Sequence, residues 1–297
     1  MKALNENQQA CLNFYKKQRR EIRRPLKNPR VAFFGTAGSY TEQAALQYFK
    51  NQGIYVAHKD SEAIFREVSE GSADYGVLPI ENSTTGSILA VYDLLSRYRC
   101  CIVGETQIKV EHCLLAIPGA TLDSIKEVLS HGQGFSQSKE FLAGHPQWKL
   151  LNYYNTAVAA EHVAKSQDPS LAAIASRRAA QIHHLDILAE NINYSATNVT
   201  RFVVVSNALE LSAARDKISI AFHLPHVAGS LYRVLGIFER HNLNLCKIES
   251  RPIPGHNWEY RFFIDFIGDI EDAKLDTVME EVISETESFH FLGNYEQ

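Results

Sequence analysis

Residues 31–41 read Val-Ala-Phe-Phe-Gly-Thr-Ala-Gly-Ser-Tyr-Thr, and this stretch indicates how the chain folds. The apolar residues at its start are typical of a short buried strand. The two glycines predict a turn, and the spacing from Ser39 to Glu42 matches the capping box that opens many helices. We therefore predict a strand, a tight loop and a helix start, which together form the basic unit of an α/β fold.

The same order of elements recurs as far as residue 205. A strand is predicted over 75–80, and it leads through the loop Glu-Asn-Ser-Thr-Thr-Gly at 81–86 into a helix over 88–95. Further predicted strands cover 113–117, 172–174 and 201–205, and further helices cover 122–129, 157–164 and 177–182. Strands that alternate with helices predict a mostly parallel sheet with both faces covered.

The pattern changes after residues 207–215, a polar and alanine-rich segment that we interpret as a linker. Alternating apolar residues predict a strand over 218–224, and helical spacing follows over 231–238. Two more strands, a helix and a last strand are predicted over 244–253, 259–267, 278–283 and 289–295. This βαββαβ order is the ferredoxin-like α+β arrangement. We expect three parts: a basic N-terminal helix and linker (1–29), an α/β domain (30–208) and an α+β domain (216–297).

The N-terminal segment is strongly basic and is punctuated by Pro25 and Pro29. We interpret it as a solvated helix followed by a linker, because a run of charge is usually a solvent-facing surface. An arm that binds anions is the alternative, and the charge run by itself does not support it.

Composition excludes several classes of protein. The 297 residues are 45% hydrophobic and carry a net charge of -4, which fits a globular protein and argues against nucleic acid as a partner. No apolar run reaches the roughly 18 residues of a membrane span. Five cysteines without Cys-x-x-Cys spacing argue against a disulfide framework or a zinc site. Since the N-terminus also lacks the features of a signal or transit peptide, we expect a cytoplasmic protein.

The two strand–loop–helix junctions, at 35–41 and 81–87, are candidate binding loops for anions. The first amides of a helix lack internal partners, and the helix dipole favours negative charge there. Ordinary helix capping is the alternative for each loop. Neither loop has the P-loop lysine or the Rossmann glycine spacing, so nucleotides are not indicated.

Two further segments combine polar side chains with strand ends. In Asn-Val-Thr-Arg-Phe at 198–202, Thr200 is a candidate hydrogen-bond donor and Arg201 a candidate partner for a carboxylate, or simply a surface arginine. Ser-His-Gly-Gln-Gly-Phe at 130–135 predicts a tight loop that displays its side chains, or a plain turn. Glu-His-Cys at 111–113 and the pair His183-His184 lack metal-ligand spacing, so we interpret them as structural.

Four motifs in this order resemble the prephenate dehydratases that end in an ACT domain. They are Gly-Thr-Ala-Gly-Ser-Tyr-Thr at 35–41, Leu-Pro-Ile-Glu-Asn-Ser at 78–83, Asn-Val-Thr-Arg-Phe at 198–202 and Ile-Glu-Ser-Arg-Pro at 248–252. The likeness covers residues 30–295 and is greatest to the dehydratase portion of bifunctional chorismate mutase–prephenate dehydratases. Residues 1–28 are similar to the end of the mutase domain or the linker after it, so we predict no mutase activity.

The resemblance implies a two-lobed dehydratase domain, similar to periplasmic binding proteins, that converts prephenate to phenylpyruvate in phenylalanine biosynthesis without a metal or organic cofactor. It implies that Thr200 assists the departing hydroxyl and that Asn82 and Gln133 orient the substrate, with a catalytic role also expected for Glu81. The substrate-binding residues that it implies are Ser39, Thr41, Ser83, Thr156, Arg201 and Phe202.

The ACT resemblance implies phenylalanine as a feedback inhibitor and assembly into homodimers or homotetramers through this domain. The implied effector site contains Val227, Ala228, Gly229, Ser230, Leu231, Glu249, Ser250, Arg251 and Pro252. Two alternatives remain open at this point. An arogenate dehydratase would act on a closely related substrate, and a non-catalytic amino-acid or anion sensor would bind prephenate without turnover.

Overall fold

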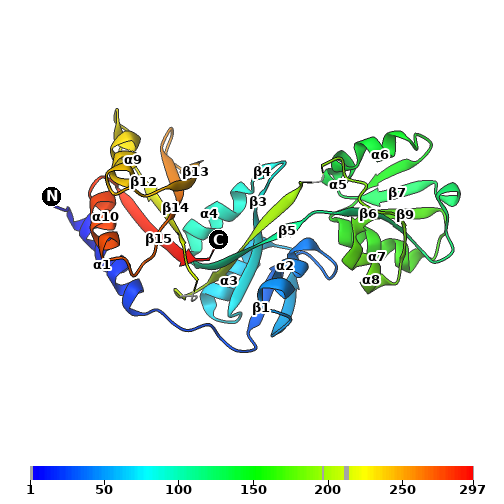
Figure 1. The fold of residues 1–297 in the computed structure, drawn as a ribbon, viewed down its shortest axis with the longest axis horizontal. Helices are drawn as coiled ribbons and strands as arrows, with labels where there is room; N and C mark the ends of the chain where they lie inside the picture. The colour runs from blue at the N-terminus through cyan, green and yellow to red at the C-terminus, as the bar shows by residue number, and fades with distance from the viewer. Residues whose placement is uncertain (1–2, 196, 211–213, 297) are drawn as a thin grey trace.

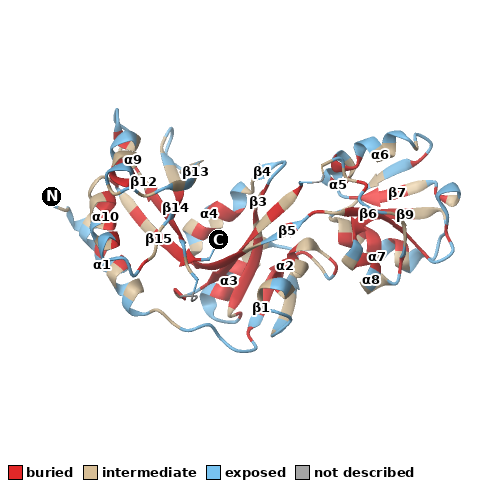
Figure 2. Ribbon diagram, viewed as in Figure 1, coloured by how far each residue is buried: buried red, intermediate tan, exposed pale blue. Residues whose placement is uncertain are grey.

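The computed structural model describes residues 3–195, 197–210 and 214–296. Its sheets form three units in a row along the long axis, and the polypeptide passes twice between the two that Figure 1 places at the centre and right. Figure 2 shows that burial is concentrated in the sheets and in the helix faces that cover them. No helix of the described chain has the length and hydropathy needed to cross a bilayer.

The central unit, here called the first lobe, contains a sheet with the strand order β2-β1-β3-β11-β5, to which β4 adds beside β3. Its strands are β1 (Arg30–Phe34), β2 (Ile54–His58), β3 (Tyr75–Asn82), β4 (Gly86–Ser87), β5 (Cys101–Lys109) and β11 (Val199–Ser206). Its helices are α2 (Tyr40–Tyr48), α3 (Ser61–Glu70) and α4 (Leu89–Tyr98). Strands β2, β1 and β3 run parallel, whereas β11 is antiparallel to both of its neighbours.

The second lobe has a sheet with the order β10-β6-β9-β7-β8. Its strands are β6 (His112–Ala116), β7 (Glu127–Ser130), β8 (Lys149–Asn152), β9 (Leu171–Ser176) and β10 (Asp186–Ala189). Its helices are α5 (Gly132–Gln137), α6 (Lys139–Ala143), α7 (Thr156–Ser166) and α8 (Arg177–His183). Strand β7 is parallel to β8 and β9, and β6 is antiparallel to β9 and β10. The prediction of two lobes is confirmed, but both sheets are mixed, so the prediction of a mostly parallel sheet was wrong.

The helix predicted over 122–129 is also absent from the described structure. A single 3-10 turn, η1 (Leu122–Ser124), is followed directly by β7. The turn closes on itself, because the Thr121 amide donates to Ser124 Oγ at 3.1 Å and that hydroxyl donates to the Thr121 carbonyl at 2.8 Å. Val128 and Leu129 then enter the core of the second lobe as strand residues. A short apolar run fits either element, and the neighbouring strands decide in favour of β.

The C-terminal unit has the predicted βαββαβ order. It consists of β12 (Lys217–His223), α9 (Ser230–Arg240), β13 (Leu245–Pro252), β14 (Tyr260–Ile267), α10 (Ala273–Ser284) and β15 (Ser288–Tyr295). The strand order is β13-β14-β12-β15, and every neighbouring pair is antiparallel. Strand β15 lies close to β5 of the first lobe, where Gly293 sits against the backbone of Ile102.

The N-terminal helix α1 (Glu6–Arg20) is not solvated as predicted, because it packs on the C-terminal unit beside α10 and β15 (Figure 1). Its apolar side buries Leu12 and Tyr15, and the Tyr15 ring contacts the rings of Phe289 and Phe291. After the helix, the Arg23 guanidinium binds Ser206 Oγ at 2.7 Å and the Glu210 carboxylate in the first lobe. The basic N-terminal segment therefore contacts both the C-terminal unit, through α1, and the first lobe, through Arg23.

Candidate active site

A cleft of about 430 Å³ lies between the two lobes. Both lobes line it, and the predicted residues that the structure brings there are Ser39, Thr41, Asn82, Gln133, Thr156, Thr200 and Phe202. They come from the ends of β3 and β11 and from the starts of α2, α5 and α7. Segments that are more than a hundred residues apart in the sequence thus share one cavity.

Asn82 and Thr200 are paired across β3 and β11 and point to the same side of the first-lobe sheet. The pairing passes from Arg201 opposite Glu81 to Phe202 opposite Pro79, so β3 has one extra residue, Ile80, at this point. Side chains alternate along a strand, and one inserted residue reverses the alternation. Because of this bulge Pro79 faces the cleft together with Asn82.

The side chain of Asn82 is buried and fully engaged. Its amide nitrogen donates to Thr200 Oγ1 at 2.9 Å and to Asn198 Oδ1 at 2.8 Å. Its carbonyl oxygen accepts the backbone amides of Thr84 at 3.1 Å and Thr85 at 3.2 Å, which fixes which end of the amide is which. Since Thr200 Oγ1 accepts from Asn82, the hydroxyl proton of Thr200 is left to donate elsewhere. Thr200 can therefore act as a donor toward the cleft.

The start of α2 forms one wall of the cleft. Ser39 is the N-cap residue, and its hydroxyl accepts the Glu42 amide at 3.2 Å, while the Glu42 carboxylate accepts the Gly38 amide at 2.9 Å. The predicted capping interaction is thus present, with the return bond shifted by one residue. Gly38 also touches the second lobe, where its carbonyl oxygen accepts a bond of 2.8 Å from Ser176 Oγ.

The start of α7, from the second lobe, forms another wall. Asn155 is its N-cap residue and accepts the Val158 amide at 2.7 Å, and Thr156 follows in the first turn. Gln133 lies in the first turn of α5, and its amide nitrogen donates across the cleft to Thr85 Oγ1 at 3.3 Å. The loop predicted at 130–135 is therefore mainly a helix start, capped by the His131 side chain.

His112 is a cleft residue that the sequence analysis missed. It is buried, and its ring contacts the Tyr40 hydroxyl at 3.2 Å and Gln137 Oε1 at 2.9 Å. Burial lowers the pKa of His112, although the Gln137 hydrogen bond opposes the shift, so the ring is neutral at pH 7. It lies at the start of β6, directly after the chain crosses between the lobes, and the sequence alone does not mark that crossing.

Electrostatically the cleft is a neutral surface with oriented dipoles. Among the described residues that line it, none is Asp, Glu, Lys or Arg. The starts of α2 and α7 present the positive ends of two helix dipoles, one from each lobe, with hydroxyls beside them. This arrangement suits a small ligand with two separate negative groups.

Three predicted residues do not reach this cleft: Glu81, Ser83 and Arg201. Neighbours in a strand face opposite sides, so Arg201 and Glu81 point away from the face that carries Thr200 and Asn82. The Arg201 guanidinium instead contacts Glu81 at 2.8 Å and Glu105 at 3.1 Å. The Ser83 hydroxyl bonds the backbone of Thr197 and Val199. In this structure Glu81, Ser83 and Arg201 are therefore not among the residues that line the cleft.

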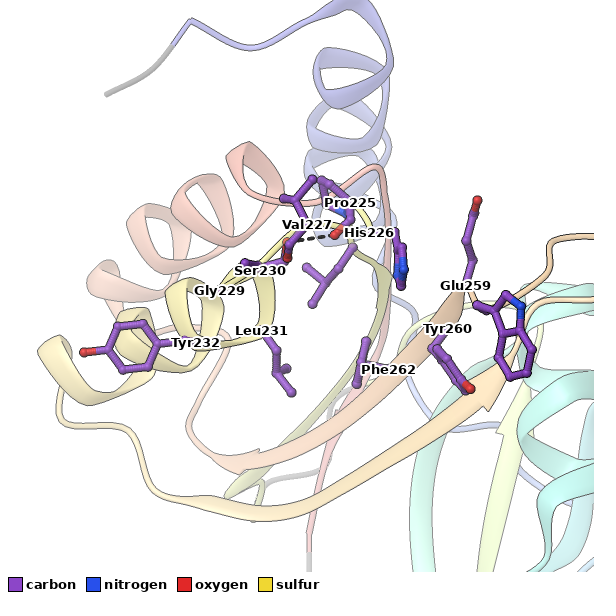
Figure 3. A pocket seen from close by; sticks show the side chains of 13 residues that line it. Pro225, His226, Val227, Gly229, Ser230, Leu231, Tyr232, Glu259, Tyr260 and Phe262 are labelled. Carbon is purple, nitrogen blue, oxygen red and sulfur yellow. Dashed lines mark hydrogen bonds between the residues drawn. The ribbon is translucent and has the colours of Figure 1, made fainter.

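A second cavity, of about 420 Å³, opens on the C-terminal unit (Figure 3). The predicted effector residues Val227, Ala228, Gly229, Ser230 and Leu231 line it, together with aromatic residues of β14 and the turn before it. Gly229 has φ +81°, a conformation that favours glycine, and it caps α9. The Ser230 hydroxyl donates to the carbonyl of Pro225 at 2.7 Å, which folds the loop back over the helix start.

The other predicted effector residues, Glu249, Ser250, Arg251 and Pro252, are not among those that line this cavity. They alternate along β13, so that Glu249 and Arg251 face the first lobe while Ser250 and Pro252 are exposed. Glu249 accepts from Ser87 at 2.5 Å, and Arg251 pairs with Asp93 at 2.7 Å. In this structure Glu249 and Arg251 therefore bind across the domain interface.

Comparisons with known proteins agree with this architecture. The family model described as prephenate dehydratase matches residues 31–209, and the ACT domain model matches 218–284. A bifunctional chorismate mutase/prephenate dehydratase of Enterobacter agglomerans is 36% identical, over 90% of this chain and 70% of that protein. A chloroplastic arogenate dehydratase/prephenate dehydratase of Arabidopsis thaliana is 38% identical, over 90% of this chain and 71% of that protein.

Among solved structures, a prephenate dehydratase from Arthrobacter aurescens in complex with L-Phe is 28% identical and superposes with a TM-score of 0.81 over 90% of each chain. The likeness thus extends through both lobes and the C-terminal unit. The cleft, the strand-end motifs and these matches together show that the chain belongs to the prephenate dehydratase family and carries a C-terminal ACT domain.

Proposed function

We propose that this chain converts prephenate to phenylpyruvate, with release of water and carbon dioxide, and that phenylalanine bound by the ACT domain inhibits it. The observation that carries the proposal is the Thr200–Asn82 pair, which lies in one cleft with two helix starts from opposite lobes. Prephenate is a dianion whose ring hydroxyl lies across the ring from both acidic groups, so it needs two anion sites and a separate donor at the far side of the ring.

The two helix starts supply the anion sites. The amides at the start of α2, with Ser39 and Thr41, would hold one carboxylate, and those at the start of α7, with Thr156, would hold the other. Gln133 and Asn82 would orient the ring. Holding both carboxylates fixes the ring hydroxyl at the far side of the ring relative to Thr200, which is the positional contribution to catalysis.

In the reaction, the bond between the ring and its carboxylate breaks and carbon dioxide leaves. The electron pair of that bond enters the ring as the C–O bond to the hydroxyl breaks, and the oxygen departs as water after gaining a proton. Thr200, held as a donor by Asn82, would stabilise the negative charge that develops on the departing oxygen. A threonine is a weak acid, so this role is electrostatic more than a supply of bulk protons.

Arogenate is the competing substrate, and some relatives carry its name. Arogenate has an ammonium group where prephenate has a ketone. An ammonium buried in the cleft would need an anionic partner, and no described lining residue is acidic. The cleft therefore favours prephenate.

The ACT cavity has features that suit an amino acid with an aromatic side chain. Leu231, Tyr260 and Phe262 provide an apolar side, and Glu259 is also among the residues that line this cavity (Figure 3). Tyr232 and Trp258 nearby are 80% and 76% exposed, which supports pairing of ACT domains in a homodimer or homotetramer. A cytoplasmic location remains a prediction, supported by five free cysteines.

The test measures phenylpyruvate by its absorbance in base, with the purified chain, prephenate or arogenate, and added phenylalanine. We expect turnover of prephenate, a lower kcat/KM with arogenate, and inhibition by phenylalanine. Binding of prephenate without product would support the sensor alternative. A higher kcat/KM with arogenate would overturn the substrate assignment.

A further inference from the structure

A largely buried group of charged side chains lies behind the strands that carry Thr200 and Asn82. We call this group the ionic cluster; its members are Glu81, Glu105, Arg201, Lys217, Lys247 and Asp265. The first three come from β3, β5 and β11 of the first lobe, and the last three come from β12, β13 and β14 of the ACT domain. The cluster contains three cations and three carboxylates, so its formal charges balance across the domain interface.

Arg201 is the centre of the cluster. Its guanidinium contacts Glu81 at 2.8 Å, Glu105 at 3.1 Å and, in the ACT domain, Asp265 at 3.3 Å. Burial lowers the pKa of Arg201, but the nearby carboxylates of Asp265 and Glu105 outweigh it and keep the pKa above its ordinary value. Arg201 is therefore a permanent cation tied to both domains.

Two lysines of the ACT domain complete the cluster. Lys217 contacts Glu105 at 2.7 Å, with the two side chains only 4% and 1% exposed. Lys247 contacts Glu81 at 2.6 Å, and with Arg201 it holds the pKa of that carboxyl below its ordinary value despite burial. Buried pairs keep their geometry, because separating them leaves an uncompensated charge.

The cluster and the reaction residues are adjacent in the backbone. Arg201 directly follows Thr200 in β11, and Glu81 directly precedes Asn82 in β3. Since strand neighbours face opposite sides, the cluster on one face is joined to the Thr200–Asn82 pair on the other through single peptide units. The bulge at Ile80 lies next to this point, so the regular ladder alone does not fix the strand there.

The ACT strands also connect the cluster to the effector cavity. Strand β12 begins at Lys217 and leads into the loop that lines the cavity, while β14 begins at Tyr260 in the cavity and continues to Asp265. Two strands therefore have one end at the effector cavity and the other at the ionic cluster. Rigid elements of this kind can carry energetic coupling between sites.

We propose that Arg201 and Glu81 are positioning residues for Thr200 and Asn82, and that the ionic cluster transmits the state of the effector cavity to this pair. The inference rests on the proposed function for its kinetic readout. It assigns Glu81 and Arg201 an indirect role in the reaction, in place of contact with substrate.

The experiment uses Glu81→Gln, Lys247→Gln and the double variant of the full chain. Both side chains are partly exposed, at 34% and 14%, so these variants are expected to fold. We expect Glu81→Gln to lower kcat about tenfold with KM for prephenate within about twofold. Lys247→Gln should lower kcat about threefold and raise the phenylalanine concentration for half-inhibition by at least about threefold. The double variant should have a kcat no lower than that of Glu81→Gln, because both changes act through one contact.

Asp93→Asn is the matched control, since Asp93 joins the same two domains through Arg251 but lies on α4 and not on β3 or β11, the strands that carry the Thr200–Asn82 pair. It should leave kcat and half-inhibition unchanged. Hydrogen exchange at residues 199–206 gives a readout without turnover. Exchange should be faster in Glu81→Gln and Lys247→Gln than in wild type or Asp93→Asn, and phenylalanine should alter it more in wild type and Asp93→Asn than in the other two variants.

Several results would overturn the inference. A change of KM without kcat in Glu81→Gln would mean that Glu81 acts on the substrate. If Lys247→Gln leaves inhibition by phenylalanine unaltered, or if Asp93→Asn changes kcat and half-inhibition as much as Lys247→Gln does, the ionic cluster does not specifically link the effector cavity to the Thr200–Asn82 pair. If wild type fails to turn over prephenate, the proposed function fails, and the exchange measurements still decide whether the cluster positions β11.

Discussion

The side-chain amide of Asn82 donates a hydrogen bond of 2.9 Å to the hydroxyl oxygen of Thr200, its partner across β3 and β11. The amide itself is fixed by six further bonds, to Asn198, Val199, Thr84 and Thr85, of which each threonine gives two. The proton of Thr200 is consequently directed away from Asn82. One side chain thus sets the donor direction of the other before any substrate binds.

Thr200→Val removes this donor while keeping the shape of the side chain. We expect kcat to fall about 100- to 1000-fold, the usual cost of losing one donor to a developing oxyanion, with a small change in KM. Thr200→Ser retains the hydroxyl and should recover a large part of kcat. Steady-state kinetics with prephenate would check this, and turnover of Thr200→Val near the wild-type value would remove Thr200 from the mechanism.

Gly38→Ala tests the contact between the lobes. Gly38 has φ +85°, and an added Cβ would lie 3.0 Å from Ala179 Cα and 3.1 Å from its Cβ in the second lobe. We expect displacement of the α2 start and a rise in KM of about fivefold or more, since small misplacements weaken binding geometry. Gly119→Ala is the control, because Gly119 has φ +87° and open space around it. If both variants raise KM equally, backbone strain and not lobe contact is the cause.

Much of this site followed from local sequence patterns. The loops at 35–41 and 81–87 and the start of β11 were predicted, because strand ends and helix starts have short-range signals. Thr200 lines the cleft and its neighbour Arg201 does not, and alternation along the strand already implied that only one of them faces the cleft. His112 and the Ile80 bulge depend on pairing between distant strands, which single-sequence patterns do not contain.

The N-terminal segment illustrates the same limit. Its polarity indicated a solvated helix, and the structure instead buries Leu12 and Tyr15 against the ACT domain. Two buried apolar residues form only a narrow apolar face on this basic helix. The helix is held because that face packs on the aromatic rings of Phe289 and Phe291. The helix was predictable, whereas its partner was not.

Tyr15→Ala tests that packing. Tyr15 is 1% exposed and lies against Phe289 and Phe291, so its truncation should lower the free energy of unfolding by about 3 kcal/mol. Lys17→Ala, on the exposed side of the same helix, should change it by less than about 0.5 kcal/mol. Urea unfolding followed by circular dichroism would measure both. Equal stability of the two variants would contradict the described packing of α1.

The buried His290 side chain should make the free energy of unfolding fall at acidic pH. Burial lowers the pKa of His290 to about 4, and the charges of Arg99 and Arg261 add to the shift. The unfolded chain therefore binds this proton first, so the contribution is complete above about pH 6.5 and is lost as pH falls toward 4. We expect a loss of up to about 3 kcal/mol across that window.

The measurement is urea unfolding at pH 7 and pH 4.5. His290→Leu should flatten the difference between the two pH values, whereas His226→Leu, at an exposed position, should preserve it. An unaltered pH dependence in His290→Leu would show that other groups cause the acid loss.

The position of α1 has a consequence for how the chain is held together. The N-terminal helix packs on the C-terminal domain, Arg23 joins the segment after that helix to the first lobe, and the ionic cluster joins the C-terminal domain to the same lobe. The covalent linker at 207–215 is then only one of several connections between the dehydratase lobes and the C-terminal domain. A chain cleaved by a protease in that segment should therefore stay together as one complex. Two fragments made separately should reassemble by complementation, because the first fragment contains α1, which packs on the second.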